Sequence, residues 1–151
     1  MERENMIQRN EMQVEFDANS VNERFARVTA AAFVAQLNPT MDEVEDIKTA
    51  VSEAVTNAII HGYDQSTGKV RMSCRLEGSQ IHIIVEDWGK GIEDVALAKQ
   101  PFYTTRPELE RSGMGFAFME AFMDDVQVES EVGKGTRITM NKRLGNVWEQ
   151  V

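Results

Sequence analysis

Two periods of hydrophobic and polar residues alternate along this chain. Period two, which is typical of half-buried strands, occurs in five short segments: residues 12–16, 70–76, 81–85, 126–128 and 138–140. The helical period of three to four residues occurs in three longer segments: residues 20–37, 40–62 and 113–122. The pattern predicts strands and helices combined in one α+β chain.

Local signals mark the ends of the first two predicted helices. Ser20 and Thr40 each precede a glutamate by three residues, which is the spacing of a capping box. Pro39 cannot continue a helix, so the first helix is expected to end at about Leu37. Gly62 is the expected end of the second helix.

Turn signals arrange the predicted strands. Gly78-Ser79 separates one pair of alternating segments and Gly133-Lys-Gly135 separates the last pair, so each pair is expected to form a hairpin. We expect a two-layer α/β sandwich in which one mixed, mostly antiparallel sheet carries helices on one face. Residues 89–112 lack a sustained period. A segment of this length is either functional or disordered.

The composition is that of one globular domain. The chain has 151 residues, of which 42% are hydrophobic and 27% are charged, and a chain of this size buries enough surface to fold without disulfides. We expect a flexible extension at 1–9, a domain at 10–143 and a tail at 144–151. Cys74 alternates with hydrophobic residues in a predicted strand, so it is expected to fill the core.

The charge of the chain limits its classes of partner. The formal net charge of −9 argues against nucleic-acid binding, because that binding depends on Lys and Arg neutralising phosphates. No targeting segment and no apolar run of roughly 18 residues is present, so we expect a cytoplasmic protein without membrane contact. A phosphate-rich ligand would need cations placed locally, and four lie near the glycine-rich segments: Lys90, Lys99, Arg106 and Arg111.

Glu53, Asn57 and His61 follow one another at four-residue spacing in the second predicted helix, so their side chains project from one face. Such a polar face is usually solvated surface. An asparagine amide oxygen is also a suitable Mg²⁺ ligand, and a glutamate one turn away can accept a proton. For His61 at the helix end, a capping or packing role is favoured over catalysis.

Asp87-Trp-Gly-Lys-Gly91 follows a predicted strand and is by itself only a turn signal. A carboxylate at a strand end can accept a hydrogen bond from the amino group of adenine, and Gly89 and Gly91 let the backbone approach a flat ring. Trp88 is expected either to flank that base or to pack ordinarily. His82, within the strand, is expected at the surface.

Ser112-Gly113-Met114-Gly115 opens the third predicted helix. Unpaired N–H groups at a helix start bind phosphate oxygens, and glycine lets those oxygens approach. The spacing is neither that of a P-loop nor that of the protein-kinase glycine loop. Thr104, Thr105 and Arg111 precede this segment, and their hydroxyls and guanidinium group would suit a lid over a terminal phosphate.

Four longer segments resemble one protein family: residues 25–29, 51–63, 102–116 and 128–132. In them the chain resembles the anti-sigma factor serine kinases of sporulating bacteria, most closely the anti-sigma F type. The resemblance runs from about residue 10 to residue 142. It implies the GHKL (Bergerat) ATP-binding fold, which gyrase-type ATPases, Hsp90, sensor histidine kinases and MutL share.

The resemblance implies a homodimer that holds a sigma factor, sigma F, in its ATP-bound state and phosphorylates a serine of an anti-anti-sigma factor. At matching positions, Glu53 would be the base, Asn57 the Mg²⁺ ligand, Asp87 the adenine acceptor, and Arg111 the contact to the terminal phosphate. Further nucleotide contacts are expected from Gly89, Gly91, Thr104, Thr105, Ser112, Gly113, Met114, Gly115 and Thr136. Arg27, expected to be exposed, matches a position that binds both protein partners.

Two alternative functions stay open. One is a stress-response kinase of the anti-sigma B type, and the other is a nucleotide-gated binding module in which Glu53 is idle. A sensor histidine kinase fragment is disfavoured, because such kinases need a phosphoacceptor histidine on a separate helix pair. His61 lies within the predicted pocket helix and His82 within a strand.

Overall fold

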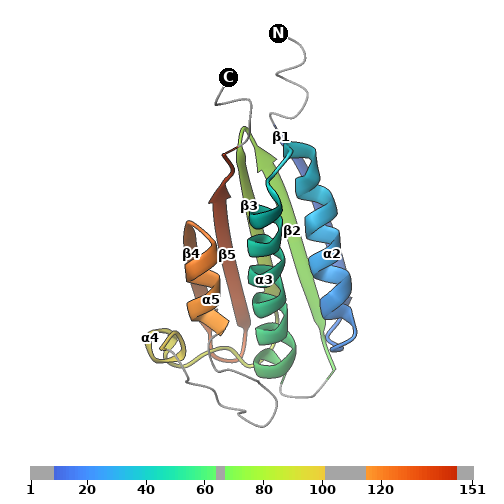
Figure 1. Ribbon diagram of the computed structural model, residues 1–151. Helices are drawn as coiled ribbons and strands as arrows, with labels where there is room; N and C mark the ends of the chain where they lie inside the picture. The colour runs from blue at the N-terminus through green and yellow to red at the C-terminus, as the bar shows by residue number, and fades with distance from the viewer. Residues whose placement is uncertain (1–8, 64–66, 101–114, 146–151) are drawn as a thin grey trace.

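The computed structural model describes residues 9–63, 67–100 and 115–145. Its strands are β1 (Arg9–Asp17), β2 (Lys69–Glu77), β3 (Gln80–Asp87), β4 (Asp125–Glu131) and β5 (Gly135–Arg143). They form one sheet in the order β1-β2-β3-β5-β4, and its pairings are antiparallel throughout the described residues. Helices α2 (Asn22–Val34), α3 (Met41–Asn57) and α5 (Gly115–Phe122) cover one face (Figure 1). The expected α+β sandwich is confirmed.

The sheet has one buried face and one polar face because its strands keep the period-two pattern. Towards the helices, β2 and β3 bury Val70, Met72, Cys74, Leu76, Ile81, Ile83 and Val85. On the other face, one row across all five strands alternates in charge: Glu15, Arg71, Glu86, Arg137 and Glu129. Arg71 lies 3.2 Å from Glu15 and Arg137 lies 3.0 Å from Glu86, which favours this strand register.

Of the two predicted capping boxes, one is confirmed and one is wrong. Thr40 Oγ1 accepts the Glu43 N–H at 3.1 Å, and Glu43 Oε1 accepts the Thr40 N–H at 2.8 Å. The Ser20 box does not form, because the N-cap of α2 is Val21, which makes no side-chain cap. Its partner Glu23 instead pairs with Arg27 at 2.7 Å.

Two further elements depart from the expected pattern. Helix α3 passes into a π-helical turn, η2 (Ala58–Gly62), and ends at the predicted glycine. After a short 3₁₀ turn, η1 (Ala35–Leu37), Asn38 adopts a left-handed conformation before Pro39. The segment after β3, which was expected to lack regular structure, contains a one-turn helix, α4 (Val95–Ala98), capped by the Asp94 side chain.

Individual core and surface positions were tested as well. Cys74 is 1% exposed, as expected, and burial raises the pKa of its thiol to about 12. His82 lies on the outward face of β3, as expected, but it is largely shielded there: its side chain is 17% exposed, it contacts Asn141, and its Nε2 lies 3.5 Å from Glu77 Oε1. Leu144, just after β5, is fully buried. None of the described helices is long and apolar enough to cross a membrane.

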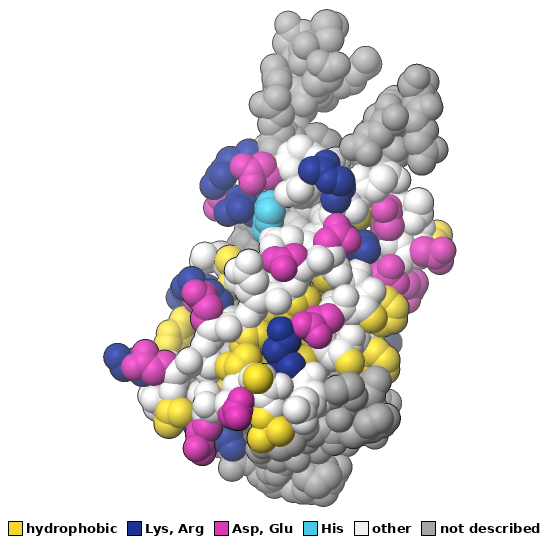
Figure 2. All heavy atoms as spheres, turned by 90° about the vertical axis from the view of Figure 1, so that its left-hand side faces the viewer, with side chains coloured by type: hydrophobic (Ala, Val, Ile, Leu, Met, Phe, Trp, Pro, Cys, Tyr) yellow, Lys and Arg dark blue, Asp and Glu magenta, His cyan; other side chains and the backbone are white. Residues whose placement is uncertain are grey.

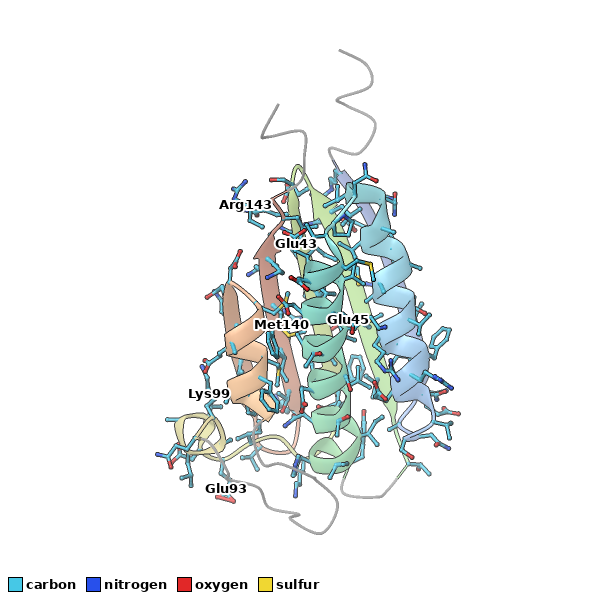
Figure 3. The ribbon with its side chains drawn as sticks, viewed as in Figure 1. Glu43, Glu45, Glu93, Lys99, Met140 and Arg143 are labelled. Atoms are coloured by element: carbon cyan, nitrogen blue, oxygen red, sulfur yellow. The ribbon has the colours of Figure 1, made fainter. Side chains whose placement is uncertain are left out.

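The molecule has two distinct ends. Figure 3 shows Glu43 at the end where α3 begins and Glu93 at the opposite end, where α3 finishes and α4 lies. Met140 is buried in the sheet between them. On the side shown in Figure 2, acidic and basic side chains are interspersed around a group of hydrophobic ones. Lys99, just after α4, pairs with Glu120 of α5 at 2.8 Å.

Candidate functional site

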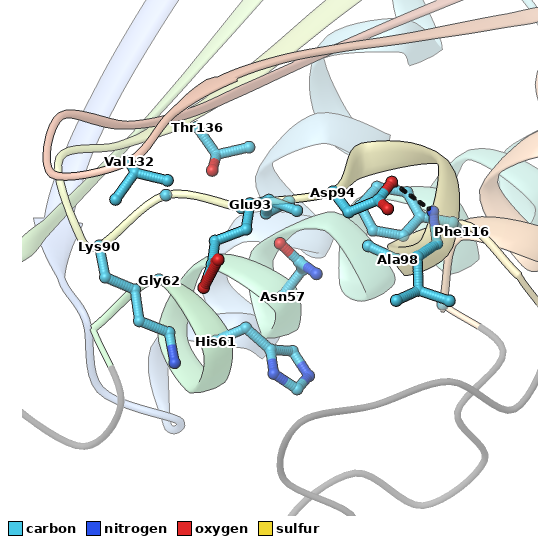
Figure 4. A pocket seen from close by; sticks show the side chains of 14 residues that line it. Asn57, His61, Gly62, Lys90, Glu93, Asp94, Ala98, Phe116, Val132 and Thr136 are labelled. Atoms are coloured by element: carbon cyan, nitrogen blue, oxygen red, sulfur yellow. Dashed lines mark hydrogen bonds between the residues drawn. The ribbon is translucent and has the colours of Figure 1, made fainter.

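A pocket of about 490 Å³ lies at the end of the sandwich where α3 finishes (Figure 4). Its wall is built from segments far apart in the sequence: the end of α3 with η2, the loop from residue 90 to α4, the start of α5, and the turn between β4 and β5. The lining side chains are both polar and apolar, including Asn57, His61, Ile92, Phe116 and Thr136. A pocket of this size and mixed lining is suited to a small organic ligand with polar groups.

Asn57 is the last residue of α3, and its side chain lines the pocket. Glu53 lies one turn earlier on the same helix and is half-buried. His61 lines the pocket from the π-helical turn. The amphipathic pattern of α3 explains this arrangement, because Val51, Ala54 and Val55 are buried against the sheet and turn the polar face to the pocket side.

Asp87 ends β3 on the helix-covered face and is 5% exposed. Burial raises the pKa of its carboxyl to about 6, although N–H groups of Gly89 and Thr136 hydrogen-bond to it and lower the pKa. Gly89 N–H donates to Asp87 Oδ1 at 2.9 Å. A carboxylate buried this deeply is a functional-site candidate, because burial of its charged form costs free energy.

The carboxylate of Asp87 lies directly beside the pocket wall. A Cβ on Gly62, a pocket-lining residue, would be 2.8 Å from Asp87 Cγ. Asp87 itself lines a second, shallower hollow, which shares only Thr136 with the main pocket among the described residues. Thr136 pairs with Asp87 across β3 and β5, so the two residues are neighbours at this side of the pocket.

The glycines after β3 are needed for close backbone contacts. A Cβ on Gly89 would lie 1.9 Å from Gly62 O. Gly91 has a φ of +80°, and a Cβ there would lie 2.3 Å from Glu131 O. The sequence pattern suggested that these glycines let the backbone approach a flat ring. In the described residues they instead let the loop after β3 pack closely against neighbouring backbone, which shapes the pocket wall.

The fold brings several predicted site residues together and leaves others untested. Asn57, Gly91, Gly115 and Thr136 line the pocket. Asp87 and Gly89 lie next to its wall at Gly62, and Glu53 lies one helical turn before Asn57. Arg27 is on α2, outside the pocket, and its side chain is 30% exposed and paired with Glu23, so the expectation that it is exposed holds only in part. The remaining predicted residues lie outside the described residues: Thr104, Thr105, Arg111, Ser112, Gly113 and Met114.

Sequence reasoning missed part of the pocket wall. Glu93 projects into the pocket between Lys90 and Asn57 in Figure 4, and Val132 comes from the β4–β5 turn. Lys90 had been noted only as a cation near the glycines. The glycines at 133 and 135 signalled a turn, but nothing in the local pattern indicated that this turn would lie against the loop after β3.

The pocket offers an oxygen donor to a metal ion that would be coordinated mainly by water and by the phosphates of a bound molecule. Among residues 9–63, 67–100 and 115–145, no group of three His, Cys, Asp or Glu side chains could hold an ion by itself. Mg²⁺ commonly takes one or two protein oxygens and completes its shell with water and phosphate. The single amide oxygen of Asn57 fits that mode of binding.

Comparison with known proteins places this architecture in a family. The family model of the histidine kinase-like ATPase domain matches residues 14–142. An anti-sigma F factor of Geobacillus kaustophilus is 61% identical over 137 residues, which cover 90% of this chain and 94% of that protein. This chain belongs to the anti-sigma F factor family. A second member, from Clostridium kluyveri, is 59% identical over 133 residues and covers 88% of this chain and 94% of its own length.

A solved structure supports the fold assignment. The crystal structure of the RsbU and RsbW domains of Rv1364c from Mycobacterium tuberculosis matches with a TM-score of 0.64, over 89% of this chain and 32% of that one. Its sequence identity is 23%, so the likeness concerns the fold alone. Together with the family match, it confirms that the domain is of the ATP-binding histidine kinase-like type.

Proposed function

We propose that this protein is an anti-sigma factor that holds sigma F when ATP is bound and phosphorylates a serine of an anti-anti-sigma factor. The observation that carries the proposal is the identity of about 60% with anti-sigma F factors over nine-tenths of the chain. The pocket supports it, because Asn57 and Thr136 line it from two different elements and the Asp87 carboxylate lies directly behind its wall at Gly62. A sigma factor works in the cytoplasm, where we place the protein.

The proposal assigns a role to each predicted nucleotide-contacting residue. The Asp87 carboxylate accepts a hydrogen bond from the amino group of adenine, and Thr136 lies beside it. The amide oxygen of Asn57 holds Mg²⁺. Ser112, Gly113, Met114 and Gly115, which lead into α5, bind the phosphates through their N–H groups. Thr104, Thr105 and Arg111 contact the terminal phosphate as a lid.

The proposed reaction transfers the terminal phosphoryl group to a serine. When bound, Mg·ATP supplies an electrophilic phosphorus atom and ADP as leaving group. Glu53 accepts the proton of the serine hydroxyl while the serine oxygen forms its bond to phosphorus and the bond to the ADP oxygen breaks. Arg111 stabilises the charge of the transferring group. The half-buried position of Glu53, one turn from Asn57, suits this role.

The proposed partner surface is the exposed side of α2. Arg27 lies on this helix together with three exposed hydrophobic side chains: Phe25 and Val28, each 50% exposed, and the N-cap residue Val21, 74% exposed. A partly exposed arginine next to exposed apolar groups is typical of a protein-binding surface. Glu23, which pairs with Arg27 at 2.7 Å, would be exchanged for an acidic group of the partner. We propose that the protein acts as a homodimer.

The decisive experiment incubates the purified protein with labelled ATP, Mg²⁺ and the cognate anti-anti-sigma factor. Serine phosphate on the partner is expected. Label on the protein's own histidine would support a histidine kinase instead. Capture of sigma F with ATP present, but no transfer to the partner, would support a nucleotide-gated binding module. Capture of sigma B in preference to sigma F would assign the protein to the stress-response branch.

A further inference from the structure

Tyr63 connects three segments that meet behind the pocket. It directly follows the π-helical turn η2. Its hydroxyl donates a hydrogen bond to the Lys69 carbonyl at the start of β2, at 2.5 Å, and accepts one from the Trp88 N–H just after β3, at 2.9 Å. The ring itself is partly buried and packs against the core. One phenol group therefore joins the end of the pocket helix to two neighbouring strands.

These bonds fix the short turn that carries Asp87. Trp88 N belongs to the peptide unit that follows Asp87, and it is held by Tyr63. Two residues later, Lys90 N–H donates to Gly62 O at 2.8 Å. Residues 62 and 63 thus hold the backbone on both sides of Gly89, whose own N–H donates to Asp87 Oδ1. The direction of the Asp87 carboxylate depends on this turn.

Asp87 is tightly enclosed by neighbouring backbone. A Cβ on Gly62 would lie 2.9 Å from both carboxylate oxygens, and a Cβ on Gly135 would lie 2.1 Å from Asp87 O. A small rotation of the peptide between Asp87 and Trp88 would redirect the carboxylate within this tight enclosure. Hydrogen bonds depend steeply on such angles.

We propose that Tyr63 is a positioning residue for recognition of the base: it orients Asp87 towards the exocyclic amino group of adenine. The inference rests on the proposed function, in which Asp87 accepts that hydrogen bond. Tyr63 touches neither nucleotide nor metal in this role. It acts by holding the peptide unit after Asp87 in place.

The test compares two nucleotides on the Tyr63→Phe variant. Phenylalanine keeps the ring and removes both hydrogen bonds. Affinity for Mg·ATP is expected to fall by about 3- to 10-fold, the range for one ordinary hydrogen bond. Affinity for purine riboside triphosphate, which lacks the amino group, should stay unchanged. An equal loss for both nucleotides, or no loss for either, would overturn the inference.

A second variant protects the test against misfolding of the first. A Cβ on Gly68 would lie 2.2 Å from Tyr63 Cε1, so Gly68→Ala displaces the ring and should cause the same selective loss for ATP. Lys69→Ala is the matched control, because Tyr63 bonds to the backbone of Lys69, whereas the Lys69 side chain pairs with Asp17. Its ATP affinity should equal that of the wild type, and an equal loss there would contradict the inference.

A double-mutant cycle separates this inference from the proposed function. In the Asp87→Asn background, Tyr63→Phe should have no further effect on ATP affinity, because the group that it positions is gone. If the wild type binds ATP and purine riboside triphosphate equally tightly, the proposed role of Asp87 fails. If the wild type discriminates and Tyr63→Phe discriminates equally well, only the positioning role fails.

Discussion

Among single residues, Asp87 is the most important for the proposed nucleotide site. It is a buried carboxylate whose partners in the described residues are backbone N–H groups, from Gly89 and Thr136. The sequence predicted its place at a strand end. The sequence did not indicate how completely it would be buried, because that depends on Gly62 and Gly135 lying against it.

Replacing Asp87 with asparagine should weaken ATP binding. The amide can present a donor where the adenine amino group needs an acceptor, and a hydrogen bond to a charged group contributes about 1.5–3 kcal/mol, which corresponds to roughly 10- to 150-fold in affinity. Equilibrium titration of wild type and variant with Mg·ATP measures this change in affinity. Glu86→Gln is the matched control, since Glu86 pairs with Arg137 on the opposite face and should leave affinity unchanged. Equal affinity of Asp87→Asn and wild type would remove Asp87 from the site.

The raised pKa of Asp87 predicts a pH dependence of stability. The folded carboxyl has a pKa of about 6, whereas its ordinary value is 3.8, so between these values the folded state binds more protons than the unfolded state. The unfolding free energy of the ligand-free protein should therefore fall as pH rises from about 4 to about 6, by up to roughly 3 kcal/mol.

The measurement is urea unfolding of wild type and Asp87→Asn at pH 4, 5, 6 and 7. The difference between the two proteins isolates this carboxyl, because their other titrating groups are the same. The stability of the variant relative to wild type should rise over this range. A difference that does not change with pH would show that the folded carboxyl titrates normally.

Replacing Glu53 with alanine should separate binding from chemistry. The change removes the proposed base but no ligand of the nucleotide, so ATP affinity should stay while phosphoryl transfer falls by about 10²- to 10⁴-fold. Glu45→Ala serves as control, since Glu45 lies on the same helix and pairs with Lys48. Loss of nucleotide affinity equal to the loss of transfer would contradict the role of Glu53.

At the element scale, the two capping motifs show where local sequence decides and where it does not. Both have the same spacing, but only Thr40 closes the box. Before α2, Glu23 N–H lies 3.3 Å from the Ser20 carbonyl in a turn, and the Asn19 side chain accepts the Val21 N–H instead. The Asn19 side chain and the Ser20 carbonyl therefore accept the N–H groups at this helix start, and the Ser20 hydroxyl does not act as the cap.

This difference gives a direct prediction about stability. Thr40→Ala should lower the unfolding free energy by about 1 kcal/mol, because it removes the acceptor for Glu43 N–H. Ser20→Ala, at the position of the box that does not form, should change it by less than about 0.5 kcal/mol. Urea unfolding of both variants checks this. Equal effects of the two substitutions would contradict the cap assignment.

The π-helical turn η2 is an element that the pattern could not predict. Its residues continue the hydrophobic period of α3, and Gly62 marked only the end. The extra residue per turn depends on contacts made later in the chain, such as Gly62 O to Lys90 N. Single π-turns are frequent at functional sites, and this one carries His61 into the pocket.

At the scale of the whole molecule, the alternating pattern predicted all the described strands and the layer order. Period-two alternation assigns the buried face of each strand without tertiary information. It could not predict how far His82 is shielded on the outward face, which depends on Asn141 from β5 and Glu77 from β2. Nor could it place Val132 and Glu93 in one pocket, because they are joined only through packing of two distant loops.

In the proposed function, one pocket holds Mg·ATP between Asp87 and the end of α3. A crystal structure of the protein grown with Mg²⁺ and a non-hydrolysable ATP analogue tests it most directly. We expect the adenine amino group within hydrogen-bonding distance of the Asp87 carboxylate and the metal on the Asn57 amide oxygen. A nucleotide bound elsewhere, or no nucleotide at saturating concentration, would contradict the account.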